Sequence, residues 1–282
     1  MSSWVVFTFL YGIFKGFFEC SKKKAVENSS TYEVLGFFSL ISFLLSIFIS
    51  KDVFNISLLP LMIVLLKSIL VVIAWIISLY VIKRISLSLY GVVNVSRVIF
   101  SILLGVVLLG EKLTSFMTIG IILVVFGLII MNVISTDENN KKFPIKLIVL
   151  LLVSCFLNSF VSIIDKRIMN YMTPSQFQFW FLLFNTIIYW IIIFIRKEKI
   201  NFNVVRKNYW ILFAAVFLVF GDKFLFIANN IVDSKVTIMT VIKQISTIEI
   251  IILGKLMFKE KNIIKKILCS LLVILGIILT II

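Results

Sequence analysis

The chain of 282 residues contains no histidine, only three cysteines and only three prolines. Without histidine, Ser-His-Asp and Cys-His catalytic arrangements and histidine-ligated metal sites are excluded. The cysteines are scattered, with neither the spacing of a metal site nor that of a disulfide framework. The sequence also has no glycine-rich phosphate loop and no carboxylate cluster suited to a metal. We therefore expect a protein that is not an enzyme and that uses no cofactor or metal.

Acidic residues are scarce as well, with 13 Asp and Glu against 28 Lys and Arg, which gives a net charge of +15. The basic residues lie in short runs between apolar segments, as membrane topology signals do, so we do not expect nucleic acid as a partner. Hydrophobic residues make up 61% of the chain, and the mean hydropathy is +1.17. Soluble domains contain about 45–50% apolar residues. The expected solvent is therefore the lipid bilayer.

Apolar runs of about 20 residues, each long enough to cross the hydrocarbon layer of about 30 Å as a helix, recur along the whole chain. The three prolines all fall at starts of these runs, where a missing N–H costs nothing. We predict an all-α membrane protein with ten transmembrane helices. The predicted spans are 3–20, 32–50, 58–82, 86–109, 114–134, 145–164, 173–195, 208–231, 235–258 and 263–282.

The two halves of the sequence resemble each other. A shift of 149 residues superposes Gly105 on Gly254, Glu111 on Glu260, Lys112 on Lys261 and Gly127 on Gly276. The first span of each half aligns at a shift of 143, which places Tyr11, Lys15 and Glu19 over Ser154, Asn158 and Ser162. Since each half holds five spans, the halves must lie in opposite orientations. We predict two inverted five-helix repeats, 1–137 and 145–282, joined by a linker at 138–144.

The segment 86–130 contains LLGEKLT at 108–114, followed by Gly120 and Gly127. This segment resembles the end of an EamA domain, from the drug/metabolite transporter superfamily. The resemblance implies two five-helix domains around a central substrate cavity, and transport of a small metabolite across a cytoplasmic membrane, commonly export. Family members often carry a proline inside the fourth and ninth helices. This chain instead has NVSR at 94–97 and IKQIS at 242–246.

Loop charges and the resemblance predict different orientations in the membrane. The loops on one side of the predicted spans hold 18 Lys and Arg, and those on the other side hold 5. By the positive-inside rule the richer set, which includes the run Lys22 to Lys24, is cytoplasmic and both termini face outward. The EamA family usually keeps both termini in the cytoplasm. Glu111 and Glu260, which end the fourth and ninth spans, are expected to be helix-end and loop residues.

Ionisable residues inside a span cost at least about 2.5 kcal/mol each on insertion and therefore suggest function. The basic ones are Lys15, Lys67, Arg97, Lys223 and Lys243, and the acidic ones are Glu19, Asp222 and Glu249. The excess of positive charge favours an anionic or zwitterionic substrate over a cation. In the alternative interpretation, Lys15 pairs with Glu19 and Asp222 pairs with a nearby lysine, and both pairs are structural.

Polar residues in the fourth span recur with helical spacing at Tyr90, Asn94, Arg97 and Ser101, so they share one face. Lys243 of the ninth span is equivalent to Asn94, which predicts a substrate site between these two helices. The predicted substrate-binding residues are Tyr90, Asn94, Arg97, Lys243, Gln244, Asn158 and Trp75. Trp75 is interpreted either as a cavity aromatic or as an interface anchor, and the phenylalanines of the seventh span, such as Phe177 and Phe181, as lipid-facing or packing residues.

The function favoured by these patterns is a secondary transporter for a small polar metabolite, in the cytoplasmic membrane of a bacterium. Proton or ion coupling would use the ionisable residues Lys15, Glu19, Asp222 and Glu249. A flippase for a lipid-linked sugar or another amphiphile is the nearest alternative. A membrane-embedded lipid transferase and a purely structural membrane protein are more distant ones.

Overall fold

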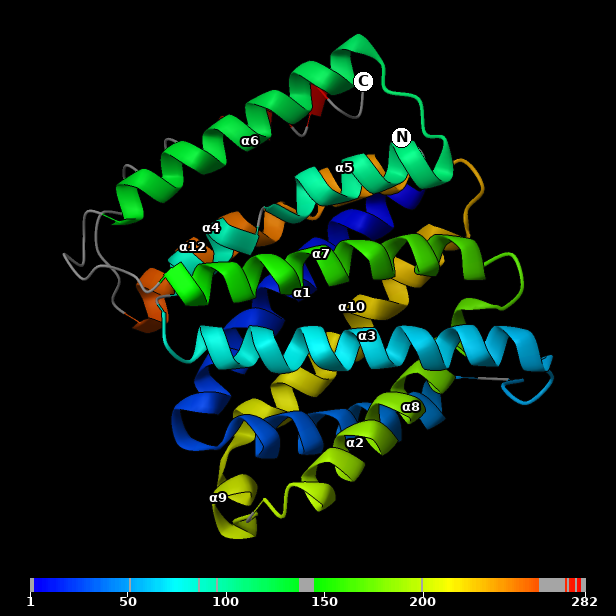
Figure 1. Cartoon of the computed structure of the whole chain (residues 1–282), viewed down its shortest axis with the longest axis vertical. Helices are drawn as coiled ribbons and strands as arrows, with labels where there is room; N and C mark the ends of the chain where they lie inside the picture. The colour runs from blue at the N-terminus through cyan, green and yellow to red at the C-terminus, as the bar shows by residue number, and fades with distance from the viewer. Residues whose placement is uncertain are drawn as a thin grey trace.

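The computed structural model describes residues 3–50, 52–85, 87–94, 96–136, 145–198 and 200–258, with a few more between 272 and 279 (Figure 1). Every regular element in these ranges is a helix. The helices are α1 (Ser3–Asn28), α2 (Thr31–Ile49), α3 (Leu58–Ile82), α4 (Leu87–Asn94), α5 (Ser96–Leu109), α6 (Ser115–Thr136), α7 (Ile145–Ile168), α8 (Pro174–Ile195), α9 (Phe202–Lys207), α10 (Tyr209–Asn230), α11 (Val236–Ile242) and α12 (Ile245–Phe258).

Within the described residues, six helical stretches are long and apolar enough to cross a membrane. They are α2, α3, α7, α8, α10 and the combined stretch Val236–Phe258, and they coincide with six of the predicted spans. Two further apolar helices, Ser96–Leu109 and Ser115–Gly127, are shorter. The predicted span 263–282 lies almost entirely outside the described residues, so the count of ten remains a prediction.

Helix α1 extends to Asn28, beyond the predicted end at residue 20. Helix α1 is not among the six stretches named above. Its buried face includes the charged residues Glu19 and Lys22. It packs most extensively against α10. Aromatic rings join the two helices, with the Phe17 and Phe217 centroids 5.2 Å apart and Phe14 and Phe224 5.6 Å apart. A charged helix is thus held in the interior of the helix bundle.

The predicted spans 86–109 and 235–258 each correspond to two helices. Between α11 and α12, the N–H of Gln244 donates to the carbonyl of Val241 (3.0 Å) and that of Ser246 to Lys243 (3.1 Å). These bonds span three residues instead of the four of an α-helix, so one turn is tightened. The ninth span is therefore interrupted without a proline, at the segment where the family often places one. Residue 95, between α4 and α5, lies outside the described residues.

Matching capping boxes start the second helix of each half. The N–H of Glu33 donates to the Ser30 hydroxyl (3.2 Å), and the Ser30 N–H donates to the Glu33 carboxylate (2.7 Å). Thr173 and Gln176 make the same pair of bonds at 3.3 and 2.9 Å at the start of α8. The two boxes are related by the shift of 143 residues. Each box satisfies two backbone donors that the helix itself leaves unpaired.

In each capping box, the acidic or amide side chain that bonds back to the first residue of the box also contacts the opposite half. Glu33 accepts a hydrogen bond from the N–H of Asn201 (2.8 Å), in the segment before α9. Gln176 donates to the carbonyl of Asp52 (3.0 Å), in the loop after α2. Asp52 and Asn201 are equivalent at the shift of 149 residues. The contacts between the halves are therefore reciprocal, as an internal repeat requires.

Two lysines at equivalent positions of the repeat bind carbonyl groups at the ends of α3 and α10. Lys23 Nζ donates to the carbonyls of Ile82 (3.0 Å) and Ile85, at the end of α3. Lys166 Nζ donates to the carbonyl of Ile231 (2.8 Å) and the hydroxyl of Ser234 (2.7 Å), after α10. Helices α1 and α7 run in opposite directions, as do α3 and α10 (Figure 1). The two lysine clamps therefore lie at opposite ends of the bundle.

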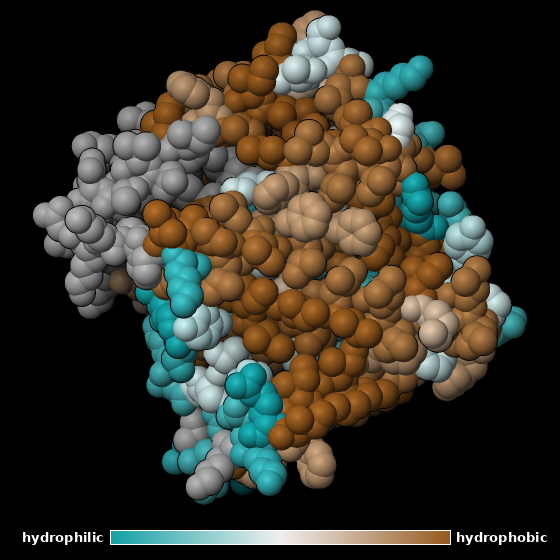
Figure 2. All heavy atoms as spheres, viewed as in Figure 1, coloured by the Kyte–Doolittle hydropathy of each residue, from teal (hydrophilic) through white to brown (hydrophobic). Residues whose placement is uncertain are grey.

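The outer surface is apolar around the middle of the helices. Large side chains near the middle of their helices, such as Ile122 of α6 and Phe220 of α10, are 61% and 44% exposed. Figure 2 shows hydrophobic residues covering the centre of this face, with hydrophilic residues toward the two ends of the long helices. This distribution suits a lipid belt bounded by two polar surfaces.

We expect Lys166→Met to lower the free energy of unfolding by about 1–3 kcal/mol, because partly buried carbonyl groups lose a charged donor. Lys23→Met should have a similar effect at the other end. Thermal unfolding of the protein in detergent measures both. Lys255→Met, which changes an exposed lysine of α12, is the control. Equal stability of all three variants would contradict a clamp role for the two lysines.

Candidate functional site

A polar cavity lies in the interior, lined by side chains of α1, α3, α4, α5, α7, α8 and α10. Both halves of the chain therefore contribute to its wall. The unfilled space is about 760 Å³, counted out to its solvent-open edge. A water-sized sphere can occupy about 70 Å³ of this space, less than the roughly 300–1,000 Å³ of typical ligand cavities.

The polar side chains that recur every four residues along α1 form a stripe that faces this cavity. Tyr11, Lys15 and Glu19 all line it, as their spacing of four residues requires. On the equivalent helix α7, Asn158 and Ser162 line the cavity, but Ser154 does not. The Ser154 hydroxyl instead donates to the carbonyl of Ala74 in α3 (2.8 Å). The stripe of α7 is therefore shared between the cavity and helix packing.

Helices α4 and α5 bring three of the predicted residues to the opposite wall. The Tyr90 and Ser78 hydroxyls are 2.6 Å apart. The Asn94 side-chain oxygen accepts from the Cys155 thiol (3.4 Å), and the Arg97 guanidinium donates to the carbonyl of Asn158 (3.4 Å). These contacts fix the directions in which the three side chains point.

Trp75 also lines the cavity, so it is a cavity aromatic rather than an interface anchor. It packs against two other rings, Phe18 at 6.1 Å and Phe38 at 5.6 Å between centroids. This packing holds the indole against the wall formed by α1 and α3.

Three predicted residues of the ninth span are not among the side chains that line the cavity. Lys243 is buried behind Tyr11, with its Nζ 5.4 Å from the centre of that ring. The Gln244 amide donates to the carbonyl of Thr240 (2.9 Å), within the same stretch of helix. Glu249 packs against Gly16 of α1. The predicted symmetry between Asn94 and Lys243 therefore does not place both on the cavity wall.

Two ion pairs neutralise most of the charge in the cavity. Glu19 pairs with Lys22 (2.7 Å), and not with Lys15 as the structural alternative expected. Lys67 of α3 pairs with Asp165 of α7 (2.8 Å). All four side chains are almost completely buried. A removed partner would leave a buried charge uncompensated, so these pairs are structural groups of the wall.

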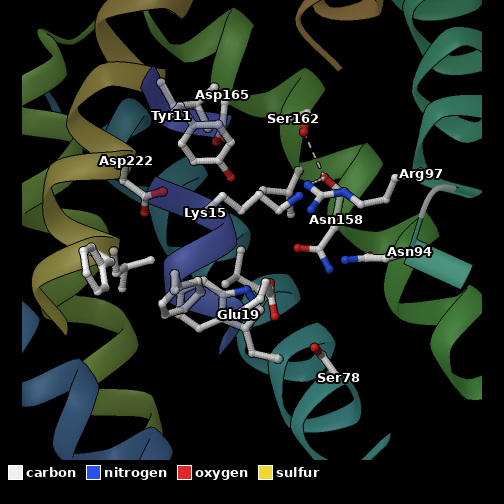
Figure 3. A pocket seen from close by; sticks show the side chains of 18 of the residues that line it. Tyr11, Lys15, Glu19, Ser78, Asn94, Arg97, Asn158, Ser162, Asp165 and Asp222 are labelled. Atoms are coloured by element: carbon white, nitrogen blue, oxygen red, sulfur yellow. Dashed lines mark hydrogen bonds between the residues drawn. The ribbon is translucent and has the colours of Figure 1, made fainter. Parts of the chain in front are cut away.

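The remaining charges of the wall have opposite signs on opposite sides. Lys15 and Arg97 point toward one another, and Asp222 of α10 lies on the far side of Lys15 (Figure 3). No ion pair joins any of these three side chains within the described part of the chain. Lys223, the neighbour of Asp222 in sequence, donates to the Ser175 hydroxyl (2.6 Å) and points elsewhere. The cavity thus offers two cations and one carboxylate to a ligand.

Sequence reasoning missed several residues of the wall. Lys22 begins a run of three lysines, a pattern that predicts a basic loop, although it continues the buried face of α1. Phe181 packs against the Phe177 ring, as one of its two interpretations expects, and it also lines the cavity. Phe226 lines the cavity too, and no pattern in the sequence singles it out. One signal was available for Lys22: it lies three residues after Glu19, on the same helical face.

Glu111 has a structural role that its position beside Lys112 did not suggest. Its carboxylate accepts hydrogen bonds from the N–H groups of Val236 (2.6 Å) and Thr237 (3.0 Å), at the start of α11. Arg167 of α7 donates to the carbonyl of Leu108 nearby, at the end of α5. The Glu111 bonds join the chain just after α5 to the start of α11, and the Arg167 bond joins α7 to the end of α5. All of them lie close to the end of the bundle that Lys166 clamps. Glu111 lies in the loop after α5, as predicted, and from there it links the two halves.

These findings define a multi-pass membrane protein with two repeats around a polar cavity. The chain belongs to the EamA-like transporter family of the drug/metabolite transporter superfamily, whose family profile matches residues 2–133 and 145–282. One solved structure, described only as the crystal structure of a protein, is similar with a TM-score of 0.70. It shares 12% identity, and the match covers 96% of this chain and 95% of that one. This likeness supports the fold alone. No curated protein matches the chain.

We expect Glu111→Ala to destabilise the start of α11, because two backbone N–H groups lose a charged acceptor worth about 1.5–3 kcal/mol for each bond. Hydrogen–deuterium exchange should quicken at Val236 and Thr237. Glu111→Gln keeps one acceptor oxygen and should give an intermediate rate. If exchange at these amides is the same in all three proteins, the proposed link is wrong.

Proposed function

We propose that this protein is a secondary transporter that moves a small polar metabolite, anionic or zwitterionic and amino-acid-like, through the cavity between its repeats. Membership of a transporter family supports transport of a small molecule across a membrane. The observation that carries the substrate class is the charge left on the cavity wall after internal pairing. The direction we propose is export, across the cytoplasmic membrane of a bacterium.

The arrangement of the unpaired charges suits a ligand with a negative and a positive end. A carboxylate placed near Arg97 and Lys15 would gain charge-assisted hydrogen bonds from both. An ammonium group would find its counter-charge in Asp222, on the far side of Lys15 (Figure 3). The wall also contains apolar and aromatic side chains, such as Leu218 and Trp75. A ligand in the cavity would therefore find partners for two charged ends and for apolar surface.

We expect Arg97→Ala to weaken substrate binding about 10- to 100-fold, which is the loss of a charge-assisted hydrogen bond. Lys15→Ala should have a comparable effect. The measurement is uptake of labelled amino acids and related metabolites by liposomes that contain the purified protein. Lys223→Ala is the matched control, because this lysine lies next to Asp222 on α10 but points toward Ser175.

Unchanged uptake by Arg97→Ala and Lys15→Ala would contradict the assignment of these residues. Transport of an amphiphile or lipid-linked sugar, with no transport of soluble metabolites, would favour the flippase alternative. Loss of uptake in Lys223→Ala as well would mean that the effect comes from the fold rather than from the cavity.

Proton coupling would require a carboxylate with no permanent ion partner. Glu19 is held by Lys22, whereas Asp222 and Glu249 have no ion pair among the described residues. The Glu249 carboxylate oxygens are buried and also lack a hydrogen-bond partner there. We infer that these two residues are the sites at which a coupled proton is carried.

We expect an imposed pH gradient to accelerate uptake by the unmodified protein, and Glu249→Gln or Asp222→Asn to remove that acceleration. Glutamine and asparagine keep the size of the side chain but cannot release a proton. Exchange of substrate at equal concentration, without a gradient, should persist in Glu249→Gln. A rate that is independent of pH in the unmodified protein would exclude coupling by protons.

A further inference from the structure

Lys67 lies in a box of aromatic rings. Its Nζ is 3.7 Å from the ring centre of Phe181, 4.1 Å from that of Phe177 and 4.7 Å from that of Phe226. Asp165 completes the surroundings with a carboxylate oxygen at 2.8 Å. All five side chains are at most 6% exposed. The ammonium group is therefore enclosed by three aromatic rings and one counter-charge.

The box is assembled from four helices of both halves. Lys67 comes from α3, Asp165 from α7, Phe177 and Phe181 from successive turns of α8, and Phe226 from α10. The rings also hold one another, since Phe226 meets Phe177 edge-on at 4.7 Å and Phe181 edge-on at 6.3 Å between centroids. The walls of the box therefore do not depend on Lys67 alone for their arrangement.

This surrounding is not what every buried lysine of the chain receives. Lys22 is equally buried and pairs with Glu19 at 2.7 Å, but both residues lie on α1, three positions apart. The Lys22 ammonium lies near one aromatic ring, that of Phe18 at 4.6 Å. One carboxylate is therefore enough to neutralise the buried Lys22. The three rings around Lys67 are not needed for that purpose.

An aromatic box with a carboxylate is the chemistry that recognises organic ammonium groups. Each ring face attracts a cation, and the attraction is strongest where water is excluded. We propose that Phe177, Phe181, Phe226 and Asp165 form a binding site for a primary organic ammonium, which Lys67 occupies as a tethered ligand. The site shares Asp165, Phe181 and Phe226 with the wall of the cavity. By occupying it, Lys67 keeps the ammonium group of a ligand out of this site, so that Asp222 is the carboxylate of the wall left for that group, and Arg97 and Lys15 are left for the negative end.

The inference rests on the proposed function, because it assigns the charge selectivity of the same cavity. Its test measures binding and needs no transport. Lys67→Ala removes the atoms from Cγ to Nζ, which together correspond to n-propylammonium. We expect n-propylammonium chloride to raise the unfolding temperature of Lys67→Ala in detergent, saturably and by at least about 2 °C. The same salt should leave the unmodified protein unchanged, because Lys67 fills the site.

Two controls separate ammonium recognition from simpler effects. 1-Propanol has nearly the same shape without the charge, and should not stabilise Lys67→Ala. Lys22→Ala leaves an unpaired buried carboxylate beside a single ring, and n-propylammonium should not stabilise it. Stabilisation of Lys67→Ala by the alcohol to the same extent, or of Lys22→Ala by the ammonium, would overturn the proposal. So would the absence of any effect on a folded Lys67→Ala protein.

A second variant keeps the proposal testable if Lys67→Ala does not fold. Lys67→Ala combined with Asp165→Asn removes both charges and keeps the three rings, which should still prefer n-propylammonium over 1-propanol. Equal effects of the two compounds on this double variant would contradict an aromatic ammonium site. An unmodified protein that transports nothing in liposomes would contradict the proposed function and leave the binding result intact.

Discussion

The fold depends on pairing the backbone N–H and C=O groups that its helix ends leave without a partner inside the helix. In this protein charged side chains from other helices supply the missing partners. Lys23 and Lys166 bind the carbonyls that end α3 and follow α10, and Glu111 binds the first N–H groups of α11. Because these partners come from different helices, each set of bonds joins neighbouring helices at one end of the bundle. The cavity lies between the two ends.

Inside the cavity the same chain uses charge in two ways. Lys22 with Glu19, and Lys67 with Asp165, are neutralised within the wall. Lys15, Arg97 and Asp222 remain for a ligand. The total of charged residues in the spans therefore does not define the substrate. What defines it is the subset that internal pairing leaves, since a buried pair presents almost no net charge to its surroundings.

Periodicity predicted those parts of the structure in which neighbours along one helix decide the outcome. The face of α1 that carries Tyr11, Lys15 and Glu19 follows from a spacing of four residues, and it lines the cavity as expected. Periodicity did not predict the ion partner of Glu19, because Lys15 and Lys22 are both within one turn of it. Only the packing of α1 selects between them. The bonds of Glu111 join residues 125 positions apart, a separation at which local patterns carry no information. The aromatic box around Lys67 is built from residues of four helices, so the sequence pattern did not predict it for the same reason.

Helix α1 carries charges that lipid does not accept, and its main packing partner is α10. A ribosome makes α1 first and reaches α10 only after about two hundred further residues. Before the second repeat is made, the charged residues of α1 therefore carry an insertion cost of about 2.5 kcal/mol or more each, with no α10 to cover them. The second repeat thus lowers the cost of placing the first helix in the membrane.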